Sequence, residues 1–380
     1  MSDTSALECQ NSNNTETYNA NNFVHVKDIT ISDETKKLLQ EAQKVYTQNF
    51  SGQTWYGRCI FLSWFCSIAD CTFCYRSTAI HQKKHPQGSR RSMGSALLEA
   101  LFCKVFNWRI EFLTAGLGAM NHKDMLEYIQ NVHAVYGEKI WLNVGVISKE
   151  HLESFKPYVK GIVSSIETPH PEIHKEVCPS KPIKPYISMY NEARDLGYAL
   201  SACFIVGFPG DDINVWFDFI EENKLQRITV YALKPVKGTP FTKGPDHDTY
   251  LQWLAKLRIR FPRLEIISGT NLRRSEEIGY TLQAGVNAVT KFPATKQFGT
   301  HKAQLIVDMM QEENRNFTSN ITKLPNIDWH KEIDALSIKE AYKIQMKEKL
   351  QNYLDTFLHP KDVDPLLCSK KDTVSKNEQH

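Results

Sequence analysis

The sequence lacks a long hydrophobic run. No stretch of it approaches the ~18–20 consecutive apolar residues that a membrane-spanning helix needs. Its first 22 residues lack the basic and apolar regions of a secretory signal peptide. Charge of one sign is equally scarce, because 46 Lys and Arg face 43 Asp and Glu and leave a formal net charge of +3. This excess is too small to indicate nucleic-acid binding. We therefore expect a cytoplasmic protein that acts on neither membranes nor nucleic acids.

The composition is that of a globular protein. Hydrophobic residues make up 41% and charged residues 23% of the 380 residues, which excludes wholesale disorder. The length corresponds to two or three ordinary domains or to one large α/β barrel. Nine cysteines occur without an export signal. They are therefore expected to be thiols or metal ligands and not a disulfide framework.

The two ends of the chain differ from its middle. Residues 1–22 are rich in Asn, Ser and Thr and predict a disordered tail, and residues 361–380 predict a flexible one. Apolar residues at helical spacing predict helices within an N-terminal extension, 23–54, and a C-terminal extension, 316–360. The second helix is expected to open with a capping box formed by Ser337 and Glu340.

Residues 55–315 alternate short apolar runs with longer amphipathic stretches. This alternation predicts a parallel sheet covered by helices. Eight such units have the size of a (β/α)8 TIM-type barrel, complete or nearly closed, although a doubly wound open sheet fits the same periodicity. The predicted strands are 59–64, 109–113, 140–146, 161–166, 199–206, 227–232, 264–267 and 288–290. In either fold the chemistry is expected at the carboxyl ends of the strands.

Three cysteines follow the first predicted strand. Cys66, Cys71 and Cys74 form a C-x4-C-x2-C run, and three thiolates within nine residues can converge on one inorganic centre. A structural zinc ion needs four protein ligands, so His81 or His85 would have to supply the fourth. Three buried cysteines without any metal are a further alternative. A 4Fe–4S cluster held by three cysteines would leave one iron open to bind a substrate or cofactor.

This triplet, with Phe73 and Tyr75 around it and a barrel after it, resembles the radical S-adenosylmethionine superfamily, in particular its biotin synthase-like group. The commonest spacing there is C-x3-C-x2-C, one residue shorter than here. The resemblance implies that Cys66, Cys71 and Cys74 hold a 4Fe–4S cluster whose open iron binds S-adenosylmethionine. An electron from the cluster then cleaves the sulfonium to a 5′-deoxyadenosyl radical.

Further segments resemble cofactor-binding motifs of the superfamily. The segment after the second strand occupies the place of a small-residue motif for the methionine amino group, and small residues allow close backbone approach. A Glu-Thr pair follows the fourth strand, and parts of the fifth and sixth strands resemble the adenine-binding segments. The implied cofactor contacts are Tyr75, Thr114, Ala115, Gly116, Glu167, Ile205, Gly207 and Leu233. Each segment also fits an ordinary strand end, ion pair or turn.

An auxiliary cluster is not expected in the form that biotin synthase uses. Asn271 stands at about the place of that enzyme's ligating arginine, and Cys103, Cys178 and Cys203 do not clearly fall at the cysteine positions. A second Fe–S cluster with other ligands, Cys178 among them, remains an alternative. The arginine pairs at 90–91 and 273–274 would suit a carboxylate on substrate or cofactor, or would simply be solvated.

The resemblance implies hydrogen abstraction from an unactivated carbon. Sulfur insertion is favoured, as in biotin synthase or in the two-subunit lipoyl synthase of archaea, where an octanoyl chain on a carrier protein is the substrate and a partner subunit takes part. The alternative is a hydrogenase-cofactor maturase or an amino-acid mutase acting on a small polar molecule. A non-catalytic zinc or Fe–S binding protein is a third reading. The enzymatic readings require an electron donor such as ferredoxin or flavodoxin.

Overall fold

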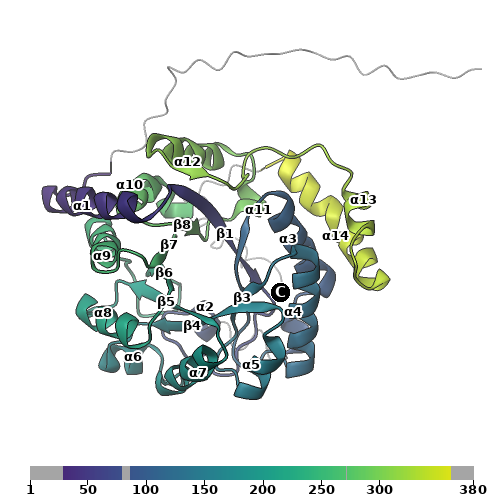
Figure 1. The fold of residues 1–380 in the computed structure, drawn as a ribbon, viewed down its shortest axis with the longest axis horizontal. Helices are drawn as coiled ribbons and strands as arrows, with labels where there is room; N and C mark the ends of the chain where they lie inside the picture. The colour runs from purple at the N-terminus through teal and green to yellow at the C-terminus, as the bar shows by residue number, and fades with distance from the viewer. Residues whose placement is uncertain (1–28, 79–85, 271, 361–380) are drawn as a thin grey trace, which may run out of the picture.

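The computed structural model describes residues 29–78, 86–270 and 272–360. Eight parallel strands close into a barrel, because the pairing runs in order from β2 to β8, returns to β1, and β1 pairs again with β2. Figure 1 shows this ring of strands with the helices outside it. The predicted (β/α)8 barrel is thereby confirmed, and the open sheet is excluded. The tails predicted at residues 1–22 and 361–380 lie outside the described residues.

Most strands are nearly continuous apolar runs, as expected where helices cover the outer face and side chains fill the inner one. The strands are β1 (Gln53–Phe61), β2 (Arg109–Thr114), β3 (Ile140–Asn143), β4 (Val159–Glu167), β5 (Ala199–Val206), β6 (Arg227–Ala232), β7 (Glu265–Gly269), β8 (Ala288–Thr290) and β9 (Asn316–Phe317). The first strand begins at Gln53 and not at Cys59, because Trp55 and Tyr56 are already buried in the barrel wall.

The helices cover the outside of the barrel (Figure 1). They are α1 (Asp33–Asn49), α2 (Tyr75–Thr78), η2 (Gln87–Ser89), α3 (Met93–Val105), α4 (His122–Tyr136), α5 (Lys149–Phe155), α6 (Pro171–Val177), α7 (Lys184–Asp195), α8 (Ile213–Glu222), α9 (His247–Arg260), η3 (Leu272–Glu277), α10 (Ile278–Gln283), α11 (Ala294–Gln297), α12 (His301–Glu312), α13 (Trp329–Asp334) and α14 (Glu340–Leu358). Among the described residues, no helix is both long and apolar enough to cross a bilayer.

The extensions pack on the barrel's outer helices. Helix α1 lies against α9, and the Asp248 carboxylate accepts hydrogen bonds from the Ser32 amide and hydroxyl, both at 2.9 Å. Helix α14 lies against α3. It begins at Glu340 with Lys339 as its N-cap and without a side-chain capping bond. The capping box predicted from Ser337 is therefore wrong, because the chain enters the helix two residues after it.

Large side chains close the amino-terminal end of the barrel lumen. The Arg227 guanidinium of β6 lies 4.6 Å from the ring centroid of Trp141 on β3 and 5.7 Å from that of Trp55 on β1. Gly161 on β4 leaves room for this layer, since a Cβ there would lie 2.2 Å from the Trp141 ring. These side chains thus fill the floor of the barrel, and the carboxyl ends of the strands are left as the place for a ligand.

Candidate functional site

The cysteine triplet lies on the loop between β1 and α2. Cys66, Cys71 and Cys74 are free thiols and all three are half-buried. Two backbone hydrogen bonds fix the loop across the mouth of the barrel: the Ser67 amide donates to the Leu117 carbonyl at 2.8 Å, and the Thr72 amide donates to the Val177 carbonyl at 2.9 Å. The loop is thereby held between the end of β2 and the end of α6.

Gly116 allows the cysteine loop to pack on the end of β2. A Cβ at this position would lie 1.9 Å from the Phe65 carbonyl oxygen and 2.7 Å from the Cβ of Cys66. Any side chain here would displace the loop, so the glycine is a steric requirement. Thr114 and Ala115, which precede it, are buried at the same strand end.

The three cysteines line a cavity of about 110 Å³ at the mouth of the barrel. Its other walls come from the ends of β2, β3 and β4 and from the segment that leads into α7. The structure therefore brings seven of the predicted site residues together. They are Cys66, Cys71, Cys74, Thr114, Ala115, Gly116 and Glu167, and they share the cavity with residues that include Arg76, Asn143, Ser165, Lys181 and Tyr186.

A buried ion pair forms one wall of this cavity. The Lys181 ammonium donates to Glu167 Oε1 at 2.9 Å and to the Ser165 carbonyl at 2.8 Å. Burial lowers the pKa of Lys181, but the Glu167 carboxylate together with the nearby Cys178 and Cys71 thiols raises that pKa overall, so the ammonium stays charged. Glu167 has a φ of +69°, in the left-handed region, at a shift in register between β4 and β5. Such strained positions cluster at ligand sites.

Cys178 lies at the end of α6, beside the triplet. A hydrogen bond from its buried thiol lowers the pKa of Cys71, and the nearby Lys181 ammonium acts in the same direction. Burial instead raises the pKa of Cys74. Because the thiolate is the form of cysteine that binds metal, the surroundings of Cys71 favour a ligand role.

The residues predicted to contact adenine lie next to the cysteine loop and outside this cavity. Ile205 and Leu233 belong to a small apolar cluster against which Cys71 and Phe73 pack. The turn after Ile205 contains Gly207 at a φ of +117°. Tyr75, at the start of α2, has a more exposed side chain and does not line the cavity. A flat apolar ligand could lie on this cluster while its polar end reached the cavity.

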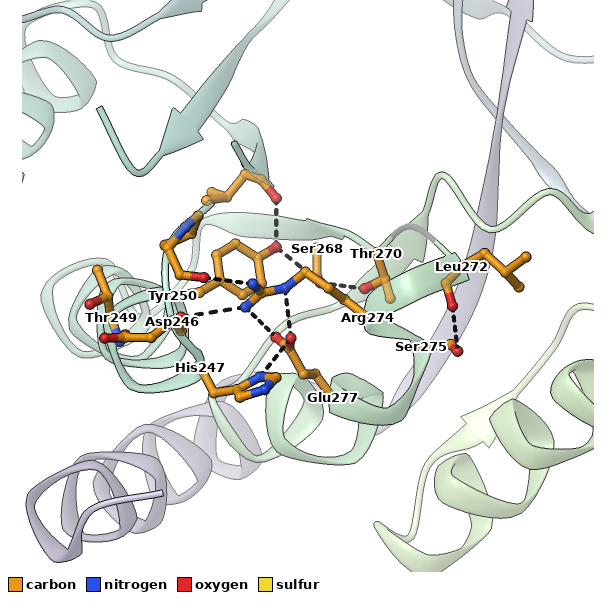
Figure 2. Close-up of polar contacts among 12 residues, drawn as sticks. Asp246, His247, Thr249, Tyr250, Ser268, Thr270, Leu272, Arg274, Ser275 and Glu277 are labelled. Atoms are coloured by element: carbon orange, nitrogen blue, oxygen red, sulfur yellow. Dashed lines mark hydrogen bonds and ion pairs between the residues drawn. The ribbon is translucent and has the colours of Figure 1, made fainter. Parts of the chain in front are cut away.

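Three of the four arginines that the sequence offered as carboxylate ligands form ion pairs away from this cavity. Figure 2 shows the Arg274 guanidinium directed at the buried carboxylate of Glu277, which also accepts from His247. Burial raises the pKa of Glu277, and both partners oppose that rise. Arg90 and Arg91 form ion pairs with Asp124 and Glu99. The cations that do line the cavity are Arg76 and Lys181. The sequence pattern missed Lys181 although it stands only three residues after Cys178.

The donor set fits a cubane cluster better than a single ion. Within residues 29–78, 86–270 and 272–360, no three His, Cys, Asp or Glu side chains stand where they could share one metal ion. In a cubane each cysteine binds a different iron, so the three sulfurs do not have to meet at one point. The alternative zinc ligands His81 and His85 lie outside the described residues, as does Asn271.

Two family models match adjoining parts of the barrel. Residues 62–222 match the Radical SAM superfamily, and this match contains the cysteine triplet, Gly116 and Glu167. The chain belongs to the radical SAM superfamily. Residues 229–315 match the Biotin and Thiamin Synthesis associated domain, which supports the biotin synthase-like group. This radical SAM enzyme therefore uses the cofactors of its family, a 4Fe–4S cluster and S-adenosylmethionine.

Among its relatives, an uncharacterized protein of Methanocaldococcus jannaschii is 29% identical over 85% of this chain and 96% of that protein. The 3-methylornithine synthase of Methanosarcina acetivorans is 24% identical over 68% of this chain and 75% of its own length. The ribosomal protein uS12 methylthiotransferase RimO of Thermus thermophilus is 35% identical, but over only 23% of this chain and 21% of its own.

Two solved structures show the same fold. A crystal structure of methylornithine synthase superposes with a TM-score of 0.63 at 18% identity and covers 75% of this chain and 90% of that one. The FeFe-hydrogenase maturase HydG of Carboxydothermus hydrogenoformans superposes with a TM-score of 0.60 at 15% identity. The superposition covers 87% of this chain and 86% of that one. At these identities the comparison establishes the barrel and not the reaction.

Proposed function

We propose that Cys66, Cys71 and Cys74 hold the 4Fe–4S cluster and that S-adenosylmethionine binds its open iron at the mouth of the barrel. One observation carries this proposal. The three thiols share a cavity with Gly116 and Glu167, and no fourth cysteine or histidine is among the described residues that line it. A cluster held by this set would keep one iron without a protein ligand.

The cluster, when bound, supplies the electron that cleaves S-adenosylmethionine, and this chemistry belongs to the cofactors. The task of this chain is to bind and orient them. Glu167 and Lys181 bring a carboxylate and an ammonium to the cavity, and in this proposal they bind the amino and carboxylate groups of methionine. Ile205 and Leu233 offer an apolar surface to adenine. The filled barrel floor keeps water from reaching the reacting atoms from below.

Within this reaction class we propose sulfur insertion as the first candidate. The match of residues 229–315 to a domain associated with biotin and thiamin synthesis supports it, as does the local similarity to a methylthiotransferase. A carrier-bound acyl or small-molecule substrate, a ferredoxin- or flavodoxin-type electron donor and a partner subunit remain part of this proposal. Rearrangement of a small polar molecule is the second candidate, supported by the similarity to 3-methylornithine synthase.

The test of the proposed cofactor site starts from anaerobically reconstituted protein. With dithionite and S-adenosylmethionine, the wild-type chain should release 5′-deoxyadenosine. Cys71→Ala should abolish this release without unfolding the barrel, whereas Cys103→Ala, which removes a buried thiol of α3, should retain it. A colourless zinc protein that leaves S-adenosylmethionine intact would refute the proposal. So would global unfolding of Cys71→Ala, because that would indicate a structural metal.

The iron content separates the two candidate reactions. Sulfur insertion needs a sulfur source, and a second cluster in each chain could supply it. We expect more iron and acid-labile sulfide per chain than one 4Fe–4S cluster contains. Iron and sulfide for a single cluster would count against sulfur insertion and would favour the rearrangement.

A further inference from the structure

The barrel lumen contains a lysine that the proposed function does not use. Lys291 directly follows β8, and its Nζ lies 5.3 Å from the ring centroid of Phe61 on β1 and 5.0 Å from that of Tyr231 on β6. Strands β1 and β6 are not neighbours in the barrel. A side chain from the end of β8 can approach both rings only from inside. Lys291 therefore projects into the lumen near the carboxyl ends of these strands.

The backbone holds Lys291 in an unfavourable conformation. Its φ is +67°, in the left-handed region that few residues other than glycine adopt. Hydrogen bonds on both sides maintain it. The Thr270 amide donates to the Thr290 carbonyl at 2.9 Å, and the Tyr56 hydroxyl donates to the Phe292 carbonyl at 2.6 Å. Glycine would make this turn with less strain, so the presence of lysine indicates that its side chain is needed.

The carboxylate deeper in the lumen already has its own donors. Glu111 of β2 is fully buried, and side chains from three other strands contact its two oxygens. These are the Thr229 hydroxyl at 2.7 Å, the Cys59 thiol at 2.9 Å, the Tyr231 hydroxyl at 3.5 Å and the Thr290 hydroxyl. Glu111 thus ties the strands together across the lumen, and both of its oxygens are occupied.

The Lys291 ammonium has no such partners. Among the described residues it makes two contacts with aromatic rings and neither a salt bridge nor a hydrogen bond, and its side chain keeps accessible surface. An ammonium carries three hydrogen-bond donors, and those of Lys291 are available to the acceptors of a bound molecule. Arg227 cannot compete for that molecule, because its guanidinium is buried in the floor and donates to the Glu111 carbonyl at 3.0 Å.

We infer that Lys291 binds a carboxylate of the substrate, and that the substrate is a small organic acid whose hydrocarbon part lies along Phe61 and Tyr231. This inference rests on the proposed function, which places the hydrogen-abstracting cofactor at the mouth above. Gly269 on β7 makes room for the Tyr231 ring, since a Cβ there would lie 1.9 Å from it. One ammonium between two rings suits a carboxylate, whereas a phosphate would call for more donors.

The test measures binding and not turnover. Hexanoate and hexanamide share a hydrocarbon chain and differ in the charged group, so calorimetric titration of anaerobically reconstituted enzyme with each isolates the carboxylate. Wild-type enzyme should bind hexanoate more tightly. Lys291→Met should weaken hexanoate binding by roughly 10- to 100-fold, the range for losing a charge-assisted hydrogen bond, and should leave hexanamide binding unchanged. Lys296→Met, which removes an exposed lysine of α11, is the matched control and should bind like wild type.

Two results would overturn the inference. One is a wild-type enzyme that shows no preference for the acid, and the other is a Lys291→Met variant of normal iron content that keeps the preference. Failure of the proposed function would look different, because wild-type enzyme would then release no 5′-deoxyadenosine whatever the titrations gave.

Discussion

Replacing Gly116 by alanine tests how the cysteine loop is seated. The new methyl group would lie 1.9 Å from the Phe65 carbonyl oxygen, which would have to retreat to about 3.0 Å, a shift of about 1.1 Å. That oxygen cannot move alone, because Phe65 is followed directly by Cys66 and by Ser67, whose amide donates a hydrogen bond to the Leu117 carbonyl. Overpacking of this kind destabilises a protein by roughly 1–3 kcal/mol. We expect a loss of that size in the free energy of unfolding, together with reduced iron uptake.

Denaturant unfolding and iron analysis of the Gly116→Ala variant measure the two effects. Gly279→Ala is the matched control, since Gly279 lies in α10 and a Cβ there would meet nothing closer than 3.8 Å. In a helix this exchange should stabilise by about 0.5–1 kcal/mol. If Gly116→Ala takes up iron and unfolds like the wild type, the cysteine loop does not pack on β2 as described.

Two further substitutions test buried ion pairs. Lys181→Met leaves the Glu167 carboxylate buried without its partner and should destabilise the protein by about 3–5 kcal/mol in urea unfolding; a loss below about 1 kcal/mol would mean that water reaches Glu167. Burial raises the pKa of Glu99, but the ion pairs with Arg58 and Arg91 together outweigh burial and lower this pKa below 4.5. This pair therefore stabilises the fold above pH 4.5, and its contribution is lost as the pH falls through the lowered pKa. Glu99→Gln should therefore reduce the loss of unfolding free energy as the pH falls below 4.5. The same exchange at the exposed Glu153 should leave that loss unchanged.

The alternation of strands and helices could be predicted from the sequence because every strand except β9 carries an apolar run bounded by helical periodicity. That periodicity fits an open sheet equally well, so the choice of the closed barrel depended on the resemblance to the family. The sequence was sufficient for part of the site, since Thr114, Gly116 and Glu167 all stand at strand ends, which parallel topology gathers at one mouth. Ile205 and Leu233 were placed by resemblance to the family, and their contact with adenine stays a prediction.

Contacts between distant strands could not be predicted. Lys181 and Lys291 look like ordinary loop lysines in the sequence, and only the closed ring shows that one meets Glu167 and the other enters the lumen. Glu111 was equally hidden, because a charged residue within a predicted strand is ordinarily placed on the solvent side. For Arg274 the sequence position suggested a ligand role that its local contacts do not support. It stands at a strand end, but Glu277 neutralises it within the same turn.

The central claim is that three cysteines hold a cluster with one open iron. Mössbauer spectroscopy of anaerobically reconstituted, ⁵⁷Fe-labelled enzyme tests it most directly, before and after addition of S-adenosylmethionine. The account predicts that the signal of a single iron in the cubane shifts on addition while the others keep theirs. A spectrum in which no iron responds, or a protein that accumulates zinc and no iron, would contradict it.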